Sequence, residues 1–233
     1  MSQIRPINLK CEYRKDPIGI DIPAPRLSWM LESEQNNKLQ EAYRIIVSDN
    51  EADITSGTGN VWDSGKVDSD RSLHIVYHGK PMKSFQRYFW KVCVWDKTGT
   101  CEEDWNNVNE VPGKGKAVPD KDGRNKEDRG KRENGNTGGT WSKAAFWETG
   151  PLGEEDWKAS WVSAPWSGEN DPMPMFRRAF RIKKRIQSAR AYICGLGYYE
   201  LFLNGARIGS NVLDPAQTDY EQRVFYVTHD ITR

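Results

Sequence analysis

The chain has 233 residues, with 34 Lys and Arg against 33 Asp and Glu, which gives a formal net charge of +1. Because 36% of the residues are hydrophobic and 11% are aromatic, a packed core is expected rather than disorder of the whole chain. The charge balance argues against nucleic acid or an anionic membrane as a partner of the whole chain, since such binders carry a surplus of positive charge.

Neither a membrane span nor a secretory signal is evident in the sequence. No run approaches the roughly 20 apolar residues that a bilayer requires, and residues 1–10 lack a continuous apolar core. The four cysteines, Cys11, Cys93, Cys101 and Cys194, form no CxxC pair and favour reduced thiols over a disulfide framework. The sequence therefore predicts a cytoplasmic protein, while a mature secreted chain whose signal has been removed stays open.

The first 150 residues read as short strands separated by turns. In 26–31, Leu27, Trp29 and Leu31 fall on one face, and 87–95 is apolar on both faces, so both of its sides are expected to be covered. Strands are predicted over 26–31, 42–47, 61–65, 73–77, 87–95 and 144–149. Short strands at this spacing are typical of an antiparallel β-sandwich.

Tyr88 stands at the start of the strongest of these strands. Met82 precedes it across a short loop, which matches a tyrosine corner, in which the phenol hydroxyl bonds backbone just upstream. The alternative is that Tyr88 is simply an aromatic residue of the core.

A charged stretch interrupts the apolar pattern at about 100–140. Residues 112–139 contain almost no apolar side chains, so they cannot bury enough surface to offset the entropy of ordering. We predict a disordered insertion at the tip of a hairpin that joins 87–96 to 143–149. A regulatory or docking loop is the alternative.

A second β module is expected after the linker Gly150–Gly153. Strands are predicted over 175–182, with Phe176 and Phe180 inward, and over 189–196, 198–203 and 224–227. Asn204-Gly205 between two apolar runs indicates a hairpin with a type I′ turn, because both residues tolerate positive φ. The predicted domains are therefore 1–150 and 151–233.

An ordered series of short motifs spans nearly the whole chain. It includes Cys11-Glu12-Tyr13-Arg14, Pro25-Arg26-Leu27-Ser28-Trp29, Val61-Trp62-Asp63-Ser64-Gly65, Tyr88-Phe89-Trp90-Lys91-Val92, Phe146-Trp147-Glu148-Thr149-Gly150, Gly195-Leu196-Gly197-Tyr198-Tyr199-Glu200-Leu201 and Thr218-Asp219-Tyr220. In this order the motifs resemble the N-terminal portion of bacterial and fungal α-L-rhamnosidases, which are inverting glycoside hydrolases. None of the motifs is a catalytic signature.

The resemblance implies an all-β chain. An immunoglobulin-like or fibronectin-III-like sandwich would be followed by an incomplete jelly-roll β-sandwich similar to galactose-binding modules. In the family, an (α/α)6 barrel with the catalytic acids follows, and that barrel would be the intramolecular partner of these modules. The resemblance thus implies non-catalytic modules of an enzyme that hydrolyses terminal α-L-rhamnose from glycosides, with a rhamnose-containing glycoside bound through the full enzyme.

Two alternatives stay open, a stand-alone carbohydrate-binding protein and a structural tandem β-sandwich. A jelly roll without its closing strands leaves unpaired edges, so we expect self-association, or disorder after about Ala189.

No catalytic residue is predicted from the sequence. Inverting hydrolysis needs two carboxyl groups about 6.5 to 9.5 Å apart. Asp214 and Asp219 are the tempting pair, but Asp214 precedes Pro215 in a turn and Asp219 lies in a loop, where each readily bonds backbone.

Sugar binding by stacking is the remaining hypothesis for a site. Aromatic faces suit a pyranose, and nearby polar groups fix its hydroxyls. The candidate residues are Trp161, Trp166, Tyr198, Tyr199, Asn204, Asp214 and Asp219, and Trp166, flanked by Pro165 and Ser167 in a loop, is the one most expected to be exposed. The alternative for the aromatic residues is a place in the core. His74, His78 and His229 are isolated in the sequence, and no metal or cofactor is predicted.

Overall fold

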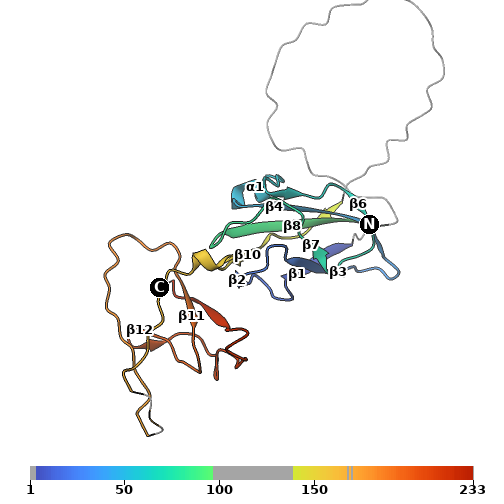
Figure 1. Cartoon of the computed structure of the whole chain (residues 1–233). Coiled ribbons are helices and arrows are strands. Elements are labelled where there is room, and N and C mark those ends of the chain that lie inside the picture. The colour runs from blue at the N-terminus through green and yellow to red at the C-terminus, as the bar shows by residue number, and fades with distance from the viewer. Residues whose placement is uncertain (1–3, 97–138, 167, 169, 233) are drawn as a thin grey trace, which may run out of the picture. The chain divides into compact units, whose positions relative to one another are not determined.

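The structure is a computed structural model that describes residues 4–96, 139–166, 168 and 170–232 (Figure 1). The described residues are mostly strand and loop, with a five-residue helix α1 (Glu51–Thr55) and a 3-10 turn at Glu154–Asp156, which confirms the all-β prediction. The predicted insertion at about 100–140 lies outside the described residues except for its last two positions, and so does Cys101.

The chain divides into two compact units. Unit 1 comprises residues 1–15, 26–79 and 89–145, and unit 2 comprises residues 16–25, 80–88 and 146–233. The domain boundary predicted between residues 150 and 151 stays a prediction.

Two sheets account for the described strands of residues 5–149. One has the order β1-β3-β7, and the other has the order β2-β10-β8-β4-β5, with β6 paired to β4 and β9 paired to β8. The bounds are β1 (Arg5–Cys11), β2 (Ile18–Ile20), β3 (Arg26–Glu32), β4 (Gln40–Ser48), β5 (Trp62–Asp63), β6 (Val67–Asp68), β7 (Ile75–Val76), β8 (Arg87–Asp96), β9 (Thr140–Trp141) and β10 (Ala145–Thr149). β2 pairs with β10 in parallel, and β4 pairs with β8 in antiparallel register.

The core of unit 1 lies between β3 and β4. The indole Nε1 of Trp29 donates to Oε1 of Gln40 at 2.9 Å, and its ring meets the edge of Tyr43 at a centroid distance of 5.3 Å. On β8, Val92 and Cys93 point to opposite faces, and both are at most 1% exposed. The prediction that both faces of this strand are covered is confirmed.

The predicted tyrosine corner is present in unit 2. The backbone N–H of Lys83 donates to the hydroxyl of Tyr88 at 2.8 Å, and Tyr88 is 2% exposed. The Tyr88 ring stacks on Trp147 at a centroid distance of 5.7 Å. The hydrogen bond therefore satisfies a loop amide while the ring contributes to the core.

Four further strands lie after residue 189. β11 (Arg190–Cys194) pairs with β14 (Tyr226–Asp230), and β12 (Phe202–Leu203) pairs with β13 (Ala206–Arg207), both antiparallel. Asn204 and Gly205 connect β12 to β13 with φ angles of 51° and 82°, which confirms the predicted hairpin turn. The strand predicted over 198–203 is shortened to β12, and the strand predicted over 224–227 is shifted to β14. Only the residues of β12 and β14 find a pairing partner there.

The strand predicted over 175–182 is wrong. The segment has no regular secondary structure, and Phe176 and Phe180, predicted to point inward, are 58% and 67% exposed. A strand needs a neighbour for its backbone groups, and no described strand pairs with this segment. Its alternating side chains therefore remain at the surface.

Candidate functional sites

A pocket of about 370 Å³ opens in unit 1. Aromatic residues Tyr43 on β4 and Trp62 on β5 line it together with Arg71, His74 and His78. The Trp62 ring meets His78 edge-on at 6.4 Å between centroids. Strand pairing brings these residues together, because β4 pairs with β5 and β7 follows directly after His74.

The polar groups of this pocket are cationic or neutral. The hydroxyl of Tyr13 lies 2.9 Å from Nε2 of His74, and Arg71 is exposed. Burial raises the pKa of Tyr43, although the positive charge of Arg71 opposes the shift, so its phenol stays protonated at neutral pH. Aromatic walls beside hydrogen-bond donors suit a small polar ligand such as a sugar. The sequence did not predict this pocket, because its residues lie on different strands and loops within 43–78 that only strand pairing brings together.

A second cluster lies in unit 2, where Tyr199, Asp214 and His229 come together. The hydroxyl of Tyr199 lies 2.8 Å from Nε2 of His229, and the backbone N–H of Tyr199 donates to the carbonyl oxygen of Asp214 at 3.1 Å. The Asp214 carboxylate accepts from Nδ2 of Asn211 at 2.8 Å. The sequence reading treated His229 as isolated, and only the pairing of β14 with β11 brings it into the cluster.

Burial sets the protonation of this second cluster. It raises the pKa of Tyr199 to about 12, with the negative charge of Asp214 adding to the shift. Burial also lowers the pKa of His229, although Asp214 opposes this. At neutral pH a neutral imidazole therefore faces a protonated phenol. Such a pair can fix a hydroxyl group, but it does not supply the two carboxyl groups that inverting glycoside hydrolysis requires.

The remaining predicted residues lie apart from this pair in the described part of the chain. Trp166 is 45% exposed and donates from Nε1 to the carbonyl of Pro172 at 3.1 Å, and Tyr198 is 46% exposed. The Asp219 carboxylate accepts from the backbone N–H of Glu221 at 3.1 Å, as expected of a turn residue. Asn204 occupies the hairpin turn, and among the described residues the hydrogen bonds of Trp166 and Asp219 go to Pro172 and Glu221, not to Tyr199 or Asp214. Sugar binding by these residues stays a prediction.

In residues 4–96, 139–166, 168 and 170–232, no three His, Cys, Asp or Glu side chains are grouped so that they can hold a metal ion. Over the same residues, no helix has the length and apolar character needed to cross a bilayer.

Two family models match the sequence. Residues 6–111 match the N-terminal immunoglobulin domain of Rha78A-like proteins, and residues 184–233 match the alpha-L-rhamnosidase N-terminal domain. An alpha-L-rhamnosidase of Formosa agariphila is 30% identical over 241 residues, which cover 94% of this chain. The chain corresponds to the N-terminal region of the α-L-rhamnosidases. The chain spans only 21% of the length of the Formosa enzyme, which is about a fifth of that protein.

Solved rhamnosidases resemble the region as well. The structure of alpha-L-rhamnosidase from Dictyoglumus thermophilum is 34% identical and superposes with a TM-score of 0.75, over 98% of this chain and 23% of that one. The Streptomyces avermitilis enzyme complexed with L-rhamnose is 28% identical with a TM-score of 0.51, over 98% of this chain and 20% of that one. The resemblance and the fold expected from it are thereby confirmed.

Proposed function

We propose that this chain serves as a non-catalytic N-terminal part of an α-L-rhamnosidase, which hydrolyses terminal α-L-rhamnose from glycosides. The observation that carries the proposal is the match of 94% of the chain to only 21% of an alpha-L-rhamnosidase. A relative that covers 98% of this chain was solved with L-rhamnose, which supports a rhamnose-containing glycoside as the substrate of the whole enzyme.

The surface of unit 2 supports a role as an accessory part. Large apolar side chains are open to solvent there, and Trp161, Met175 and Leu213 are 65%, 93% and 70% exposed. We infer that another protein surface covers these side chains in the whole enzyme, since large exposed apolar areas mark interaction sites. In the proposed enzyme the catalytic barrel is that partner, and it carries the acid pair that the described residues do not assemble.

A graft tests the proposal. The fifth of the Streptomyces avermitilis enzyme that matches this chain is replaced by the full chain, and by the matching region of the Alteromonas enzyme as a control. That enzyme is 29% identical to this chain. We expect both grafts to yield soluble enzyme that hydrolyses p-nitrophenyl α-L-rhamnoside. The proposal fails if the control graft is active and the graft of this chain is insoluble or inactive.

Carbohydrate binding by the chain itself is a second candidate, and the pocket of unit 1 favours it. Trp62 and Tyr43 offer aromatic faces, and Arg71 offers a planar set of donors. Titration with methyl α-L-rhamnoside, followed by indole fluorescence, measures binding. We expect saturation that Trp62→Ala abolishes, while Trp166→Ala, which alters an exposed indole outside the pocket, separates this pocket from the site predicted from the sequence. No saturation at millimolar sugar removes this candidate.

A further inference from the structure

Positive charge is concentrated in one segment of unit 2. Six cationic residues fall within nine positions, and no acidic residue occurs between Asp171 and Glu200. The six are Arg177, Arg178, Arg181, Lys183, Lys184 and Arg185. Residues 176–185, called the basic segment below, carry a charge of +6, whereas the whole chain has a net charge of only +1.

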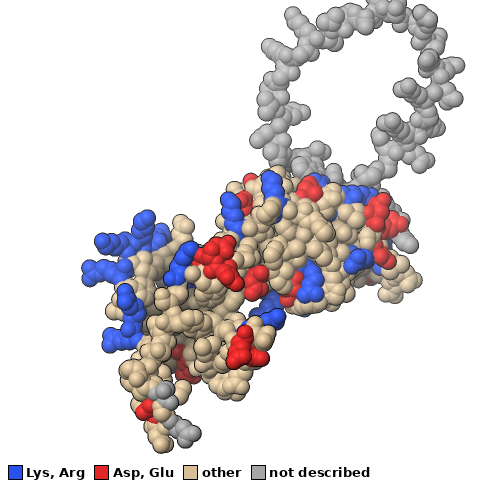
Figure 2. Space-filling model, viewed as in Figure 1, with Lys and Arg blue, Asp and Glu red and all other residues tan. Residues whose placement is uncertain are grey.

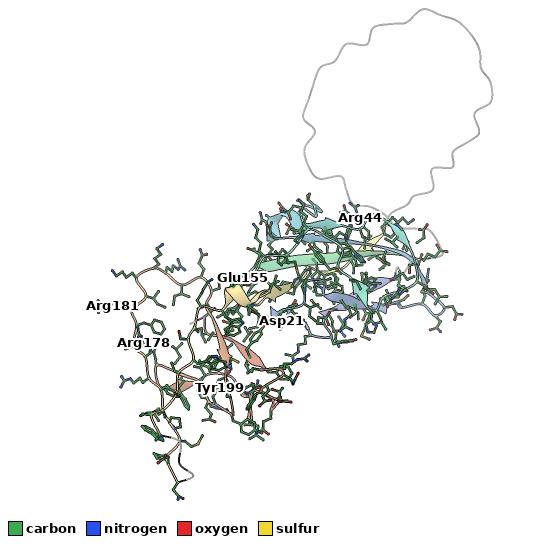
Figure 3. All side chains as sticks on the ribbon, viewed as in Figure 1. Asp21, Arg44, Glu155, Arg178, Arg181 and Tyr199 are labelled. Atoms are coloured by element: carbon green, nitrogen blue, oxygen red, sulfur yellow. The ribbon has the colours of Figure 1, made fainter. Side chains whose placement is uncertain are left out.

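The cations of the basic segment are open to solvent. All six are exposed, and Figure 2 shows Lys and Arg side chains gathered on this part of the chain. Figure 3 shows Arg178 and Arg181 projecting from the ribbon. None of the six forms an ion pair with any described residue. By contrast, Arg190 of the same unit pairs with Glu148 and Asp230.

Apolar side chains alternate with these charges. Phe176, Phe180 and Ile182 are 58%, 67% and 54% exposed, and the segment has no regular secondary structure. A second copy of the chain is a poor occupant here, because six positive charges would face six others. The complementary occupant is an extended polymer that carries negative charges and also offers apolar faces.

We propose that the basic segment binds an acidic polysaccharide whose sugars carry uronate carboxylates. A guanidinium fork pairs a carboxylate with two parallel hydrogen bonds, and aromatic rings pack against the apolar faces of pyranose units. The choice of a glycan over other polyanions rests on the proposed function in an enzyme that acts on glycosides. The segment would hold an acidic polymer that also bears rhamnose.

The test is titration of the full chain with polygalacturonate at low and moderate salt, with dextran as the neutral control. R178Q/R181Q/K184Q removes three charges from the segment, and R14Q/K15Q/K143Q removes three exposed charges from unit 1. Each exposed charge contact contributes roughly two- to fivefold in affinity, so the first variant, which loses three, should bind at least about tenfold more weakly. The second variant should bind polygalacturonate like the unaltered chain. Added salt should weaken the binding of polygalacturonate by the second variant and by the unaltered chain.

Three outcomes overturn the proposal. They are no binding of polygalacturonate, equal losses in the two variants, and tighter binding to duplex DNA or to phosphatidylserine vesicles at the same concentration of negative charge. The graft experiment is independent of these results. An active graft without polygalacturonate binding refutes this inference alone, whereas an inactive graft of this chain beside an active control graft refutes the proposed function.

Discussion

Glu148 on β10 is the acceptor at the centre of an ion-pair network in unit 2. Its Oε1 lies 2.7 Å from Nε of Arg190, and its Oε2 accepts from Nη2 of Arg87 at 3.1 Å. The side chains of Glu148 and Arg190 are only 10% and 9% exposed. Breaking a buried pair by removing one partner costs about 3 to 5 kcal/mol, because the remaining charge is left in a poorly solvated place.

We therefore predict that Glu148→Gln lowers the free energy of unfolding by about 3 kcal/mol, near the lower end of that range. The lower end applies since Arg190 keeps Asp230 at 2.7 Å, and the Asp230 side chain is 55% exposed. For a chain of this size, about 2 to 4 °C are lost per kcal/mol, so the melting temperature of unit 2 should fall by about 6 to 12 °C.

Urea unfolding and scanning calorimetry measure this effect. The matched control is Glu32→Gln, which breaks a pair with Arg5 whose side chains are 50% and 61% exposed. Such a surface pair contributes about 0 to 1 kcal/mol. If Glu148→Gln lowers the free energy of unfolding no more than Glu32→Gln does, burial does not strengthen the ion pairs of Glu148, and the prediction is wrong.

Three further predictions concern stability, pH and association. Tyr88→Phe leaves the amide of Lys83 without its acceptor and should cost about 1 to 2 kcal/mol in urea unfolding, whereas the exposed Tyr198→Phe should be neutral; equal effects would contradict the tyrosine corner. The folded state holds the pKa of His229 below its ordinary value of 6.5, so the unfolded chain binds more protons just below that pH. Stability should then be full above about pH 6.5 and fall as the pH drops, and urea unfolding across this range should show a flatter dependence for His229→Gln. Exposed apolar side chains of unit 2 outside the basic segment, such as Trp161 and Leu213, should drive self-association, and light scattering that finds a monomer at all concentrations would refute this.

Local rules predicted the elements that depend on a few neighbouring residues. The turn at Asn204-Gly205 needs only two residues that tolerate positive φ, and Tyr88 needs only a loop amide five residues upstream. β1 was missed because its register shifts between Ile7 and Lys10, which breaks the period of two that marks a strand. Helix α1 was not predicted, since it has only five residues; the side chain of Asn50 accepts the backbone N–H of Ala52 and caps it.

Features that depend on pairing across the chain were beyond the sequence. The alternating residues of 175–182 have the pattern of a strand, but a pattern forms a strand only where another strand pairs with it. The pocket that holds Trp62, Arg71 and His74 likewise exists only because β4, β5 and β7 come together. The periodicity of a single segment does not predict which other strand it pairs with.

We propose that this chain contributes to a rhamnosidase without performing its chemistry. The direct measurement is release of p-nitrophenol from p-nitrophenyl α-L-rhamnoside by the purified chain, with a full-length rhamnosidase as the positive control. We predict a rate equal to that of buffer alone. Turnover that scales with the concentration of the chain and disappears in Asp214→Asn would place the catalytic acids inside these β modules and contradict the account.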